Sequence, residues 1–449
     1  MNQLHVFFFP LMAHGHMIPT LEMAKLFTSR GVQTTIIATP GFVKPIENAR
    51  NSGFNIGIHL MKFPPEKSEL PDGITSFDQI FSDGMIPKFT KALELLQEPV
   101  EKLLEEFRPD CLVADMFFPW ATDAAAKFDI PRLVFHGTSC FSLCTSEHMR
   151  IYKPYNNVSS DSEEFVLPNL PHLLKFTRTQ VPDFVREEIE NDLTKLFTKV
   201  KESETRSYGV LVNSFYELEP DYADHYRKFL KRNTWHIGPL LLSNKGGEDD
   251  KAQRGNESAI DEHECLEWLN SEQPNSVKFI WVVREGKERE ENENWLPEGF
   301  EEKTKDKGLI IKGWAPQLLI LQNKAIGAFV THCGWNSTLE GVCSELPMVT
   351  WPLFAEQFFN EKLVTEVLRI GVSVGSKQWK RTASEGIERE AIAMAIRRIM
   401  EGEEGAEMRS RAQEYKKKAR MAIEEGGSSY NDLRALLQEL SAYRLRVTT

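Results

Sequence analysis

The second half of this chain contains the stretch AFVTHCGWNSTLE, residues 328–340, which passes from a short apolar run through a glycine into a helical pattern. The apolar residues 328–330 predict a strand, and Gly334 permits a tight turn after it. Asn336 and Ser337 are residue types favoured at the start of a helix. A helix that begins here would direct free backbone N–H groups and its positive end toward an anion such as a diphosphate.

His332 in this turn allows two interpretations. It could donate a hydrogen bond to a bound anion, or it could be a satisfied core histidine beside an ordinary capped helix. The turn taken alone leaves both roles open. Two other phosphate-binding patterns are absent: no G-x-G-x-x-G follows a strand, which disfavours a dinucleotide dehydrogenase, and no P-loop G-x-x-x-x-G-K-[ST] occurs.

Length and charge narrow the class of protein. The chain has 449 residues with 41% hydrophobic content, which predicts two domains. Its net charge of -12 has the wrong sign for a general nucleic-acid or anionic-membrane binder. The cysteines form no C-x-x-C pair, which indicates a reduced, cytoplasmic compartment. We expect no signal peptide and no membrane span, because residues 4–9 lack a basic leader and no apolar run approaches about 18 residues.

Short apolar runs alternate with helical patterns along both halves of the chain. Strands are predicted at residues 6–9, 34–38, 111–114, 133–135, 279–283, 309–311 and 328–330. Helices are predicted at residues 17–30, 87–107 and 120–128. Pro19 would lie in the first turn of the first helix, and Gly31 would end it. This order predicts an α/β fold with parallel sheets that helices cover on both faces.

A longer segment of 44 residues surrounds the turn, beginning with WAPQ at residues 314–317 and ending with PLFAEQ at residues 352–357. The segment closely resembles the signature box of plant family-1 UDP-glycosyltransferases, and the rest of the chain is similar to this family over nearly its whole length. The resemblance implies the GT-B fold, in which two Rossmann-like doubly wound domains face each other across a cleft.

The resemblance and the composition together suggest domain boundaries. We expect an N-terminal acceptor-binding domain at residues 1–242 and a C-terminal UDP-sugar-binding domain at residues 263–430. Residues 243–262 are polar and rich in Gly, Asn, Asp and Glu, which is typical of a linker. A helix at residues 431–449 is expected to pack back on the N-terminal domain.

The resemblance also implies roles in the donor site. Trp314 would stack on uracil, while Gln317 and the backbone of Ala315 would meet the polar edge of the base. Glu340 would accept hydrogen bonds from the ribose hydroxyls. The phosphates would be held by His332, Asn336 and Ser337. The hexose would be contacted by Glu356, Gln357 and Trp335. In this family a glutamine and a tryptophan at the places of Gln357 and Trp335 accompany UDP-glucose more often than other donors.

Glucose transfer to a hydroxyl group needs a base for the proton and stabilisation of the departing diphosphate. His16 follows the first predicted strand and Asp115 follows the strand at residues 111–114, so parallel strands would deliver both to one sheet edge. The catalytic pair of the family matches these positions, which implies direct displacement with inversion, His16 as base and Asp115 as its partner. Structural roles remain open for both. His14 and His16 could also suggest a metal pair, but no third ligand is evident and we assign no metal.

The acceptor is expected to be an apolar small molecule. Aromatic candidates for its pocket, each of which could equally belong to the core, are Phe117, Phe118, Trp120, Phe141, Phe184 and Phe197. The resemblance is to enzymes that glucosylate flavonoids, other phenolics and terpenoids in plant secondary metabolism. We expect a monomer that uses UDP-glucose as co-substrate and needs no cofactor.

The chain departs from the family after PNSV, residues 274–277. Family members continue there with a strand, a Gly-Ser phosphate loop and a helix, whereas here residues 278–281 begin the next strand directly. Parallel neighbours need a crossover of about a dozen residues or more, so one β-loop-α unit is expected to be missing after Val277. We therefore expect weak or absent activity, and the alternative function is nucleotide-sugar binding without turnover.

Overall fold

The computed structural model describes residues 3–71, 73–80, 83–187, 190–243, 254–255, 258–271, 278–283, 296, 298–380 and 386–448. The chain divides into two compact units. Unit 1 comprises residues 1–244 and 328–449, and unit 2 comprises residues 245–327. Residues 274–277 and most of the predicted linker lie outside the described residues. The expected domain boundaries at residues 242 and 263 stay predictions.

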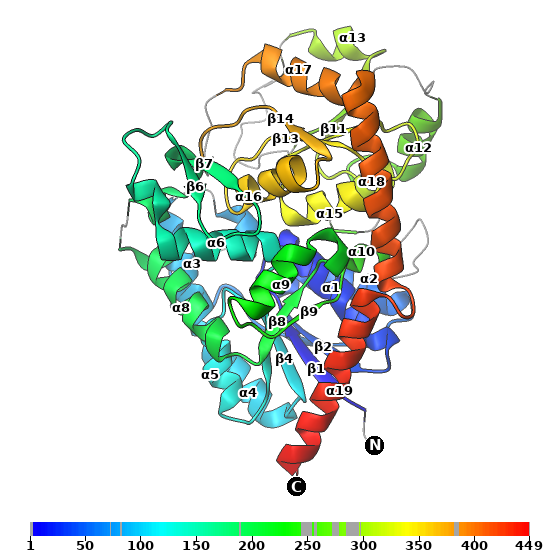
Figure 1. Cartoon of the computed structure of the whole chain (residues 1–449). Coiled ribbons are helices and arrows are strands. Elements are labelled where there is room, and N and C mark those ends of the chain that lie inside the picture. The colour runs from blue at the N-terminus through cyan, green and yellow to red at the C-terminus, as the bar shows by residue number, and fades with distance from the viewer. Residues whose placement is uncertain are drawn as a thin grey trace. The chain divides into compact units, whose positions relative to one another are not determined.

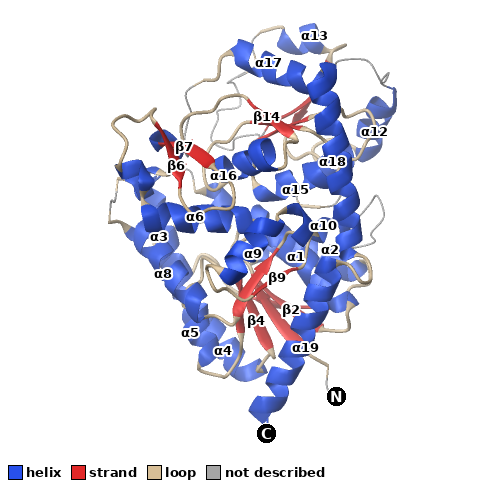
Figure 2. Cartoon of the chain, viewed as in Figure 1, coloured by secondary structure: helices blue, strands red, loops and turns tan. Residues whose placement is uncertain are grey.

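Unit 1 is built on a seven-stranded sheet in the order β3-β2-β1-β4-β5-β8-β9, in which every neighbouring pair is parallel. Its strands are β1 (His5–Phe9), β2 (Gln33–Ala38), β3 (Ile56–Leu60), β4 (Cys111–Asp115), β5 (Arg132–Phe135), β8 (Gly209–Val212) and β9 (Thr234–His236). A parallel sheet is buried on both faces, which explains continuous apolar runs such as residues 6–9. The predicted α/β fold with a parallel sheet is confirmed (Figure 2).

Helices surround this sheet (Figure 1). The helices of unit 1 are α1 (His14–Ser29), α2 (Val43–Asn51), α3 (Ile86–Leu95), α4 (Gln97–Phe107), α5 (Ala121–Ala126), α6 (Cys140–Tyr152), α7 (Asp183–Arg186), α8 (Asp192–Arg206), α9 (Pro220–Lys228), α10 (Leu240–Ser243), α15 (Trp335–Cys343), α16 (Gln357–Lys362), α17 (Arg389–Met400), α18 (Gly402–Ile423) and α19 (Ser428–Thr448). Short helical turns include η2 (Phe77–Gln79), η5 (Arg178–Gln180) and the π-helical η7 (Leu363–Val367). The C-terminal helix α19 packs against β9, and its Leu433, Leu436 and Leu440 belong to the same apolar core as β1 and β4. None of the described helices has both the length and the apolar character that a membrane span requires.

Two predicted helices differ from the structure. The single helix expected at residues 87–107 is two helices, α3 and α4, which separate at Leu96. Pro99 explains the break, because a proline cannot donate to the carbonyl four residues earlier, here that of Leu95, and its ring clashes with that group. The first helix begins at His14, three residues before the expected start, so Pro19 lies in its interior.

The strands of the second half are present where they were predicted, but they form two separate sheets. In unit 2, β10 (Phe279–Val283) pairs in parallel with β11 (Gly308–Lys312). Unit 2 also contains α12 (Glu262–Ser271), α13 (Phe300–Thr304) and α14 (Gln317–Leu321). In unit 1, β12 (Phe329–Thr331), β13 (Met348–Thr350) and β14 (Gly371–Ser373) form a three-stranded parallel sheet. Unit 1 further holds the antiparallel hairpin β6 (Glu164–Leu167) and β7 (Leu174–Thr177).

Candidate functional site

His16 and Asp115 lie at the carboxyl ends of neighbouring strands. β1 and β4 pair in parallel with Phe9 opposite Ala114, so the chain that follows each strand emerges at the same sheet edge. Asp115 is the last residue of β4, and His16 lies in the first turn of α1. His16 Nδ1 lies 2.6 Å from Asp115 Oδ2. The structure therefore brings the two predicted residues into direct contact.

The buried Asp115 carboxylate is held from two sides, because Oδ1 accepts a hydrogen bond from the Phe117 backbone N–H at 3.0 Å while Oδ2 meets His16. With Nδ1 donating to the carboxylate, Nε2 of His16 is the nitrogen that can accept a proton. Burial lowers the pKa of His16, but the charge and hydrogen bond of Asp115 raise that pKa above its ordinary value. The charges of Glu356 and Asp78 raise the same pKa further. The imidazole is thus a stronger base than an isolated one.

Arg132 is a buried cation behind this pair, and no pattern in the sequence pointed to it. Its guanidinium donates to the backbone carbonyl of Asp115 at 2.9 Å and to the Thr122 hydroxyl at 3.0 Å. Burial lowers the pKa of Arg132 to about 10, with the charges of Asp115 and Glu204 acting in the opposite direction. Arg132 therefore remains charged at neutral pH and fixes the end of β4 that carries Asp115.

His14, the second member of the suggested metal pair, contacts a carboxylate. Its Nδ1 lies 2.6 Å from Asp78 Oδ2, and the same oxygen accepts from the His14 backbone N–H at 2.9 Å, which secures the start of α1. Among the described residues, a metal-like grouping occurs elsewhere, at Cys140, Glu219 and His236. There the Glu219 carboxylate already accepts from the backbone N–H groups of Cys140 and Phe141, so it caps the start of α6.

Asn336 connects the first turn of α15 to the first turn of α1. Pro19 lies inside α1 and has no N–H to donate to the carbonyl of Gly15, four residues earlier. That carbonyl instead accepts a hydrogen bond from Asn336 Nδ2 at 2.8 Å. Pro19 thus leaves the Gly15 carbonyl, one residue from His16, free to accept. Asn336 of α15, the predicted phosphate-binding helix, donates to it.

Trp335 anchors α15 within unit 1. Its side chain is buried, and its indole N–H donates to the backbone carbonyl of Asn213 at 2.7 Å. Glu340 is buried further along the same helix, and Ser337 in the first turn is half-buried. The contact of Trp335 with the hexose stays a prediction, because the indole is already packed into the core that α6 and α16 share.

The turn before α15 carries His332 close to a glycine. Gly334 is the N-cap of α15, and no side-chain cap bond is made there. His332 is exposed, and its Nε2 would lie 2.5 Å from a Cβ placed on Gly334. Glycine at this position therefore leaves room for the imidazole in front of the helix start, where a bound phosphate is predicted.

Glu356 is the N-cap of α16, and Gln357 is the first residue of that helix. Gln357 Oε1 accepts from the backbone N–H groups of Leu353 and Phe354 at 2.9 and 3.1 Å, so this side chain shapes the loop that precedes α16. Burial raises the pKa of Glu356 above its ordinary value, while its own backbone N–H and the charge of His16 act against that rise. Glu356 therefore belongs to the same electrostatic site as His16.

Asn360 is a buried neighbour of Glu356 that the sequence patterns did not single out. It is buried on α16, where its amide nitrogen donates to the Cys333 carbonyl at 2.8 Å and to Glu356 Oε1 at 3.2 Å. Its oxygen accepts from the Ser142 hydroxyl at 2.7 Å. The spacing of four residues from Glu356 was the available signal, because residues four apart share one helix face.

The residues predicted to bind uracil belong to unit 2. Trp314 follows β11, and its backbone carbonyl accepts from the Ala259 N–H at 2.7 Å. Gly255 packs so closely on the Trp314 indole that a Cβ would collide with the ring. Ala315 is buried in the core of unit 2, and Gln317 is the first residue of α14.

The aromatic candidates for the acceptor pocket divide into two groups. Phe118, Phe141 and Trp120 are packed against other core rings, which favours their structural role. Three half-buried rings instead extend from the pair His16 and Asp115. Phe117 lies against His16 at 5.9 Å, and Phe197 lies against Phe117 at 6.1 Å. Phe184 stacks on Phe197 at 5.4 Å and completes what we call the aromatic row, Phe117, Phe197 and Phe184.

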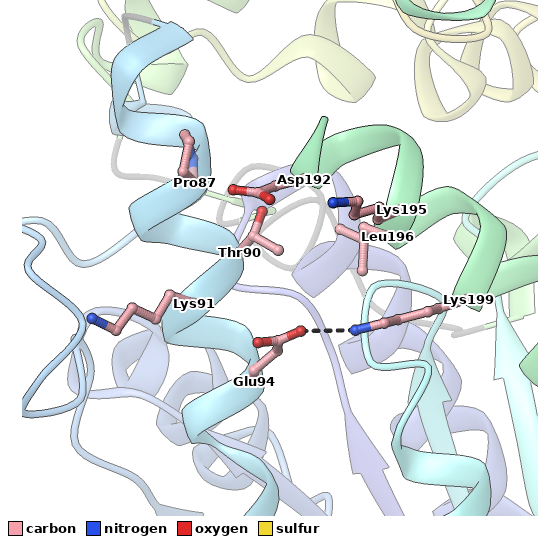
Figure 3. A pocket seen from close by; sticks show the side chains of 8 residues that line it. All are labelled: Pro87, Thr90, Lys91, Glu94, Asp192, Lys195, Leu196 and Lys199. Carbon is pink, nitrogen blue, oxygen red and sulfur yellow. Dashed lines mark hydrogen bonds and ion pairs between the residues drawn. The ribbon is translucent and has the colours of Figure 1, made fainter. Parts of the chain in front are cut away.

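A separate small hollow lies between α3 and α8, and Figure 3 shows the side chains that line it. Its walls are mostly charged, and Glu94 and Lys199 form an ion pair across it at 3.1 Å. None of the predicted site residues lines this hollow, and its mixed charges do not suit an apolar acceptor.

Comparison with known proteins agrees with this fold. A family profile described as "Glycosyltransferase, N-terminal domain" matches residues 2–242, and one described as "UDP-glucoronosyl and UDP-glucosyl transferase" matches residues 276–403. Scopoletin glucosyltransferase of Nicotiana tabacum is 57% identical over 99% of each chain. Anthocyanin 3'-O-beta-glucosyltransferase of Gentiana triflora is 52% identical, again over 99% of each chain.

A solved structure is also similar over the whole chain. The crystal structure of Glycyrrhiza uralensis UGT73P12, complexed with glycyrrhetinic acid 3-O-monoglucuronide, superposes with a TM-score of 0.91 at 39% identity, covering 100% of this chain and 97% of that one. The fold and site thus define an α/β glycosyltransferase of the GT-B type, as predicted. The chain belongs to the plant family-1 UDP-glycosyltransferases.

Proposed function

We propose that this enzyme transfers glucose from UDP-glucose to a hydroxyl group of an apolar small molecule, with inversion at the anomeric carbon. The observation that carries the proposal is the 2.6 Å contact between His16 and Asp115 at one edge of the sheet. The names of relatives support the donor and the acceptor class, because they describe glucosyltransferases of scopoletin, an anthocyanin and flavonoids.

The proposed chemistry is one displacement step. Nε2 of His16 takes the proton of the acceptor hydroxyl as its oxygen bonds to the anomeric carbon. The bond between that carbon and the phosphate oxygen breaks, and UDP leaves with the electron pair. Asp115 orients the imidazole and stabilises the imidazolium that forms. The start of α15, with His332, Asn336 and Ser337, would meet the negative charge of the departing diphosphate.

The proposed donor contacts are assigned within each unit separately. Trp314, Ala315 and Gln317 would hold uracil, Glu340 the ribose, and Glu356 and Gln357 the hexose hydroxyls. The acceptor would lie on the aromatic row, because planar rings stack favourably on half-buried aromatic side chains. Flavonoids, other phenolics and terpenoids remain the proposed classes, and no cofactor beyond the co-substrate is needed for this step.

His16→Ala is the direct test of the base. We expect the turnover of UDP-glucose with a phenolic acceptor to fall by roughly 10²- to 10⁴-fold, because the proposed step then loses its general base. UDP binding, measured by calorimetry, should stay unchanged. His263→Ala is the matched control, because that side chain is 82% exposed and lies in unit 2. Undiminished product formation in His16→Ala would remove His16 as the base.

A second function, nucleotide-sugar binding with little or no turnover, is favoured by one specific observation. The strands of the second half form two sheets, β10–β11 and β12–β13–β14, where the family pattern implies another strand after Val277. The alignment with the tobacco relative also runs over 475 positions, which exceeds the 449 residues of this chain. Calorimetry with UDP beside mass spectrometry of products separates the two functions. Binding without glucoside supports the second, and a clean time course of glucoside supports the first.

A further inference from the structure

Residues 376–380, which we call the strap, follow β14 and bind the loop that precedes α16. The Ser376 hydroxyl donates to the Pro352 carbonyl at 2.8 Å, and the Lys380 backbone N–H donates to the Leu353 carbonyl at 2.9 Å. The Trp379 indole N–H donates to the Ala355 carbonyl at 3.1 Å. Three hydrogen bonds therefore tie the strap to residues 352–355.

On its other side the strap is bound to Thr179 in η5 and packs against Phe184 in α7. The Thr179 hydroxyl donates to the Lys377 carbonyl at 2.7 Å, and the Trp379 backbone N–H donates to the Thr179 carbonyl at 2.8 Å. The Trp379 ring also packs edge-on against Phe184 at 5.8 Å, which extends the aromatic row. Trp379 is 9% exposed, so it is held between these two partners.

Ala355, which accepts the hydrogen bond from the Trp379 indole, has a strained backbone conformation. Its φ of 52° lies in the left-handed region, which is strained for a residue with a Cβ. Its side chain is exposed, so packing does not compensate for that strain. The next residue is Glu356, whose charge contributes to the site of His16. A hydrogen bond to the Ala355 carbonyl therefore helps hold the turn that aims Glu356.

We propose that Trp379 is a positioning residue that couples the acceptor wall to the sugar-binding loop. Its ring packs on the aromatic row, its backbone is bound to Thr179, and its indole N–H maintains the turn at Ala355. Binding of an acceptor against Phe184 then stabilises the geometry of Glu356 without touching it. The expected kinetic effect rests on the proposed function. The structural coupling can be measured by hydrogen exchange, which needs no turnover.

Trp379→Phe tests the coupling, because it keeps an aromatic ring beside Phe184 and removes the indole N–H together with part of the ring. We expect KM for UDP-glucose to rise at least threefold and kcat to fall, with KM for the acceptor changed less. Ala355→Gly in the Trp379→Phe background should recover part of the loss, since glycine adopts the left-handed conformation without strain. Lys377→Ala is the matched control, because it removes an exposed side chain and keeps the strap backbone.

Hydrogen exchange of the full chain gives a readout that does not need activity. Trp379→Phe should speed amide exchange in residues 353–357, and the added Ala355→Gly should slow it again. Unchanged exchange together with unchanged KM would overturn the proposal, as would a loss that Ala355→Gly does not reduce. If wild-type protein makes no glucoside, the proposed function fails while exchange still decides the coupling. Should Trp379→Phe fail to fold, Ser376→Ala removes another bond to the same loop, and unchanged exchange there overturns the proposal.

Discussion

At the residue scale, the environment of His16 is set by residues that lie far from it in the sequence. Asp115 and Arg132 come from two adjacent strands, and Glu356 comes from the last third of the chain. The negative charges of the nearby carboxylates raise the pKa of His16, whereas burial disfavours the charged imidazolium and lowers that pKa. The strength of the base is therefore a sum of opposing effects, and single substitutions should shift it in known directions.

Asp115→Asn should change the pH dependence of transfer. The base works when His16 is neutral, so the rate rises with pH through the raised pKa of His16. Removal of the Asp115 charge lowers that pKa, and the acidic limb of kcat/KM should move to lower pH. The maximal kcat should also fall, by roughly 10²- to 10⁴-fold, because the imidazolium loses its partner.

Asp78→Asn serves as the comparison for this profile. Asp78 also raises the pKa of His16, but its charge is the smallest of the contributions, so the limb should move in the same direction by less. Rates measured from about pH 5 to 9 decide the matter. A limb that moves to higher pH in Asp115→Asn contradicts the assigned role.

At the scale of elements, α1 and α15 meet through a carbonyl that a proline has set free. Gly15 would normally accept from the residue four positions later, but Pro19 has no N–H. The Asn336 side chain donates to that carbonyl instead, which joins α1, the helix of His16, to α15, the helix predicted to bind phosphate. A proline inside a helix usually leaves one backbone carbonyl without its helical partner. Here that carbonyl, on Gly15, accepts the hydrogen bond from Asn336.

Pro19→Ala should weaken this contact without weakening α1. The new N–H competes with Asn336 for the Gly15 carbonyl, while alanine is the most favourable residue in a helix. We expect kcat/KM for UDP-glucose to fall by roughly two- to tenfold, which corresponds to a loss of about 0.5–1.5 kcal/mol. Thermal unfolding should show an unchanged or raised midpoint.

A double-mutant cycle controls this prediction. In an Asn336→Ala background the competition has no target, so Pro19→Ala should have little further effect on kcat/KM. Equal losses in both backgrounds would mean that Pro19 acts through α1 alone. The hydrogen bond between Asn336 and Gly15 would then make no contribution to kcat/KM.

At the scale of the whole molecule, the two small sheets have open edges. Among the described residues, β10 pairs only with β11 and β12 pairs only with β13. Their exposed apolar residues are Phe279, Trp281 and Val282 on β10 and Val330 on β12. An exposed apolar edge strand promotes self-association, because its backbone groups can pair with another chain.

Insertion of the β-loop-α unit of a relative after Val277 should raise both stability and turnover. A further strand would pair with an edge of a small sheet, and its phosphate loop is expected to add a contact to the nucleotide. We expect a higher unfolding midpoint, less aggregation and at least tenfold tighter UDP binding. An insert of equal length made of glycine and serine is the control and should give none of these gains. Equal behaviour of both inserts would contradict the expected missing unit.

The sequence by itself determined the class of fold. Strand and helix periodicities and the turn at Gly334 are local patterns, and the alternation of strands with helices predicts a parallel sheet. It also named His16 and Asp115, since residues after parallel strands share one sheet edge. It could not place Arg132, Asn360 or Trp379, because these act through hydrogen bonds between segments distant in the chain. Only the tertiary structure decided that a carbonyl freed by Pro19 would meet Asn336 and that the predicted strands of the second half would form two sheets. Such outcomes depend on which backbone groups find partners across the fold, and local sequence carries no record of that.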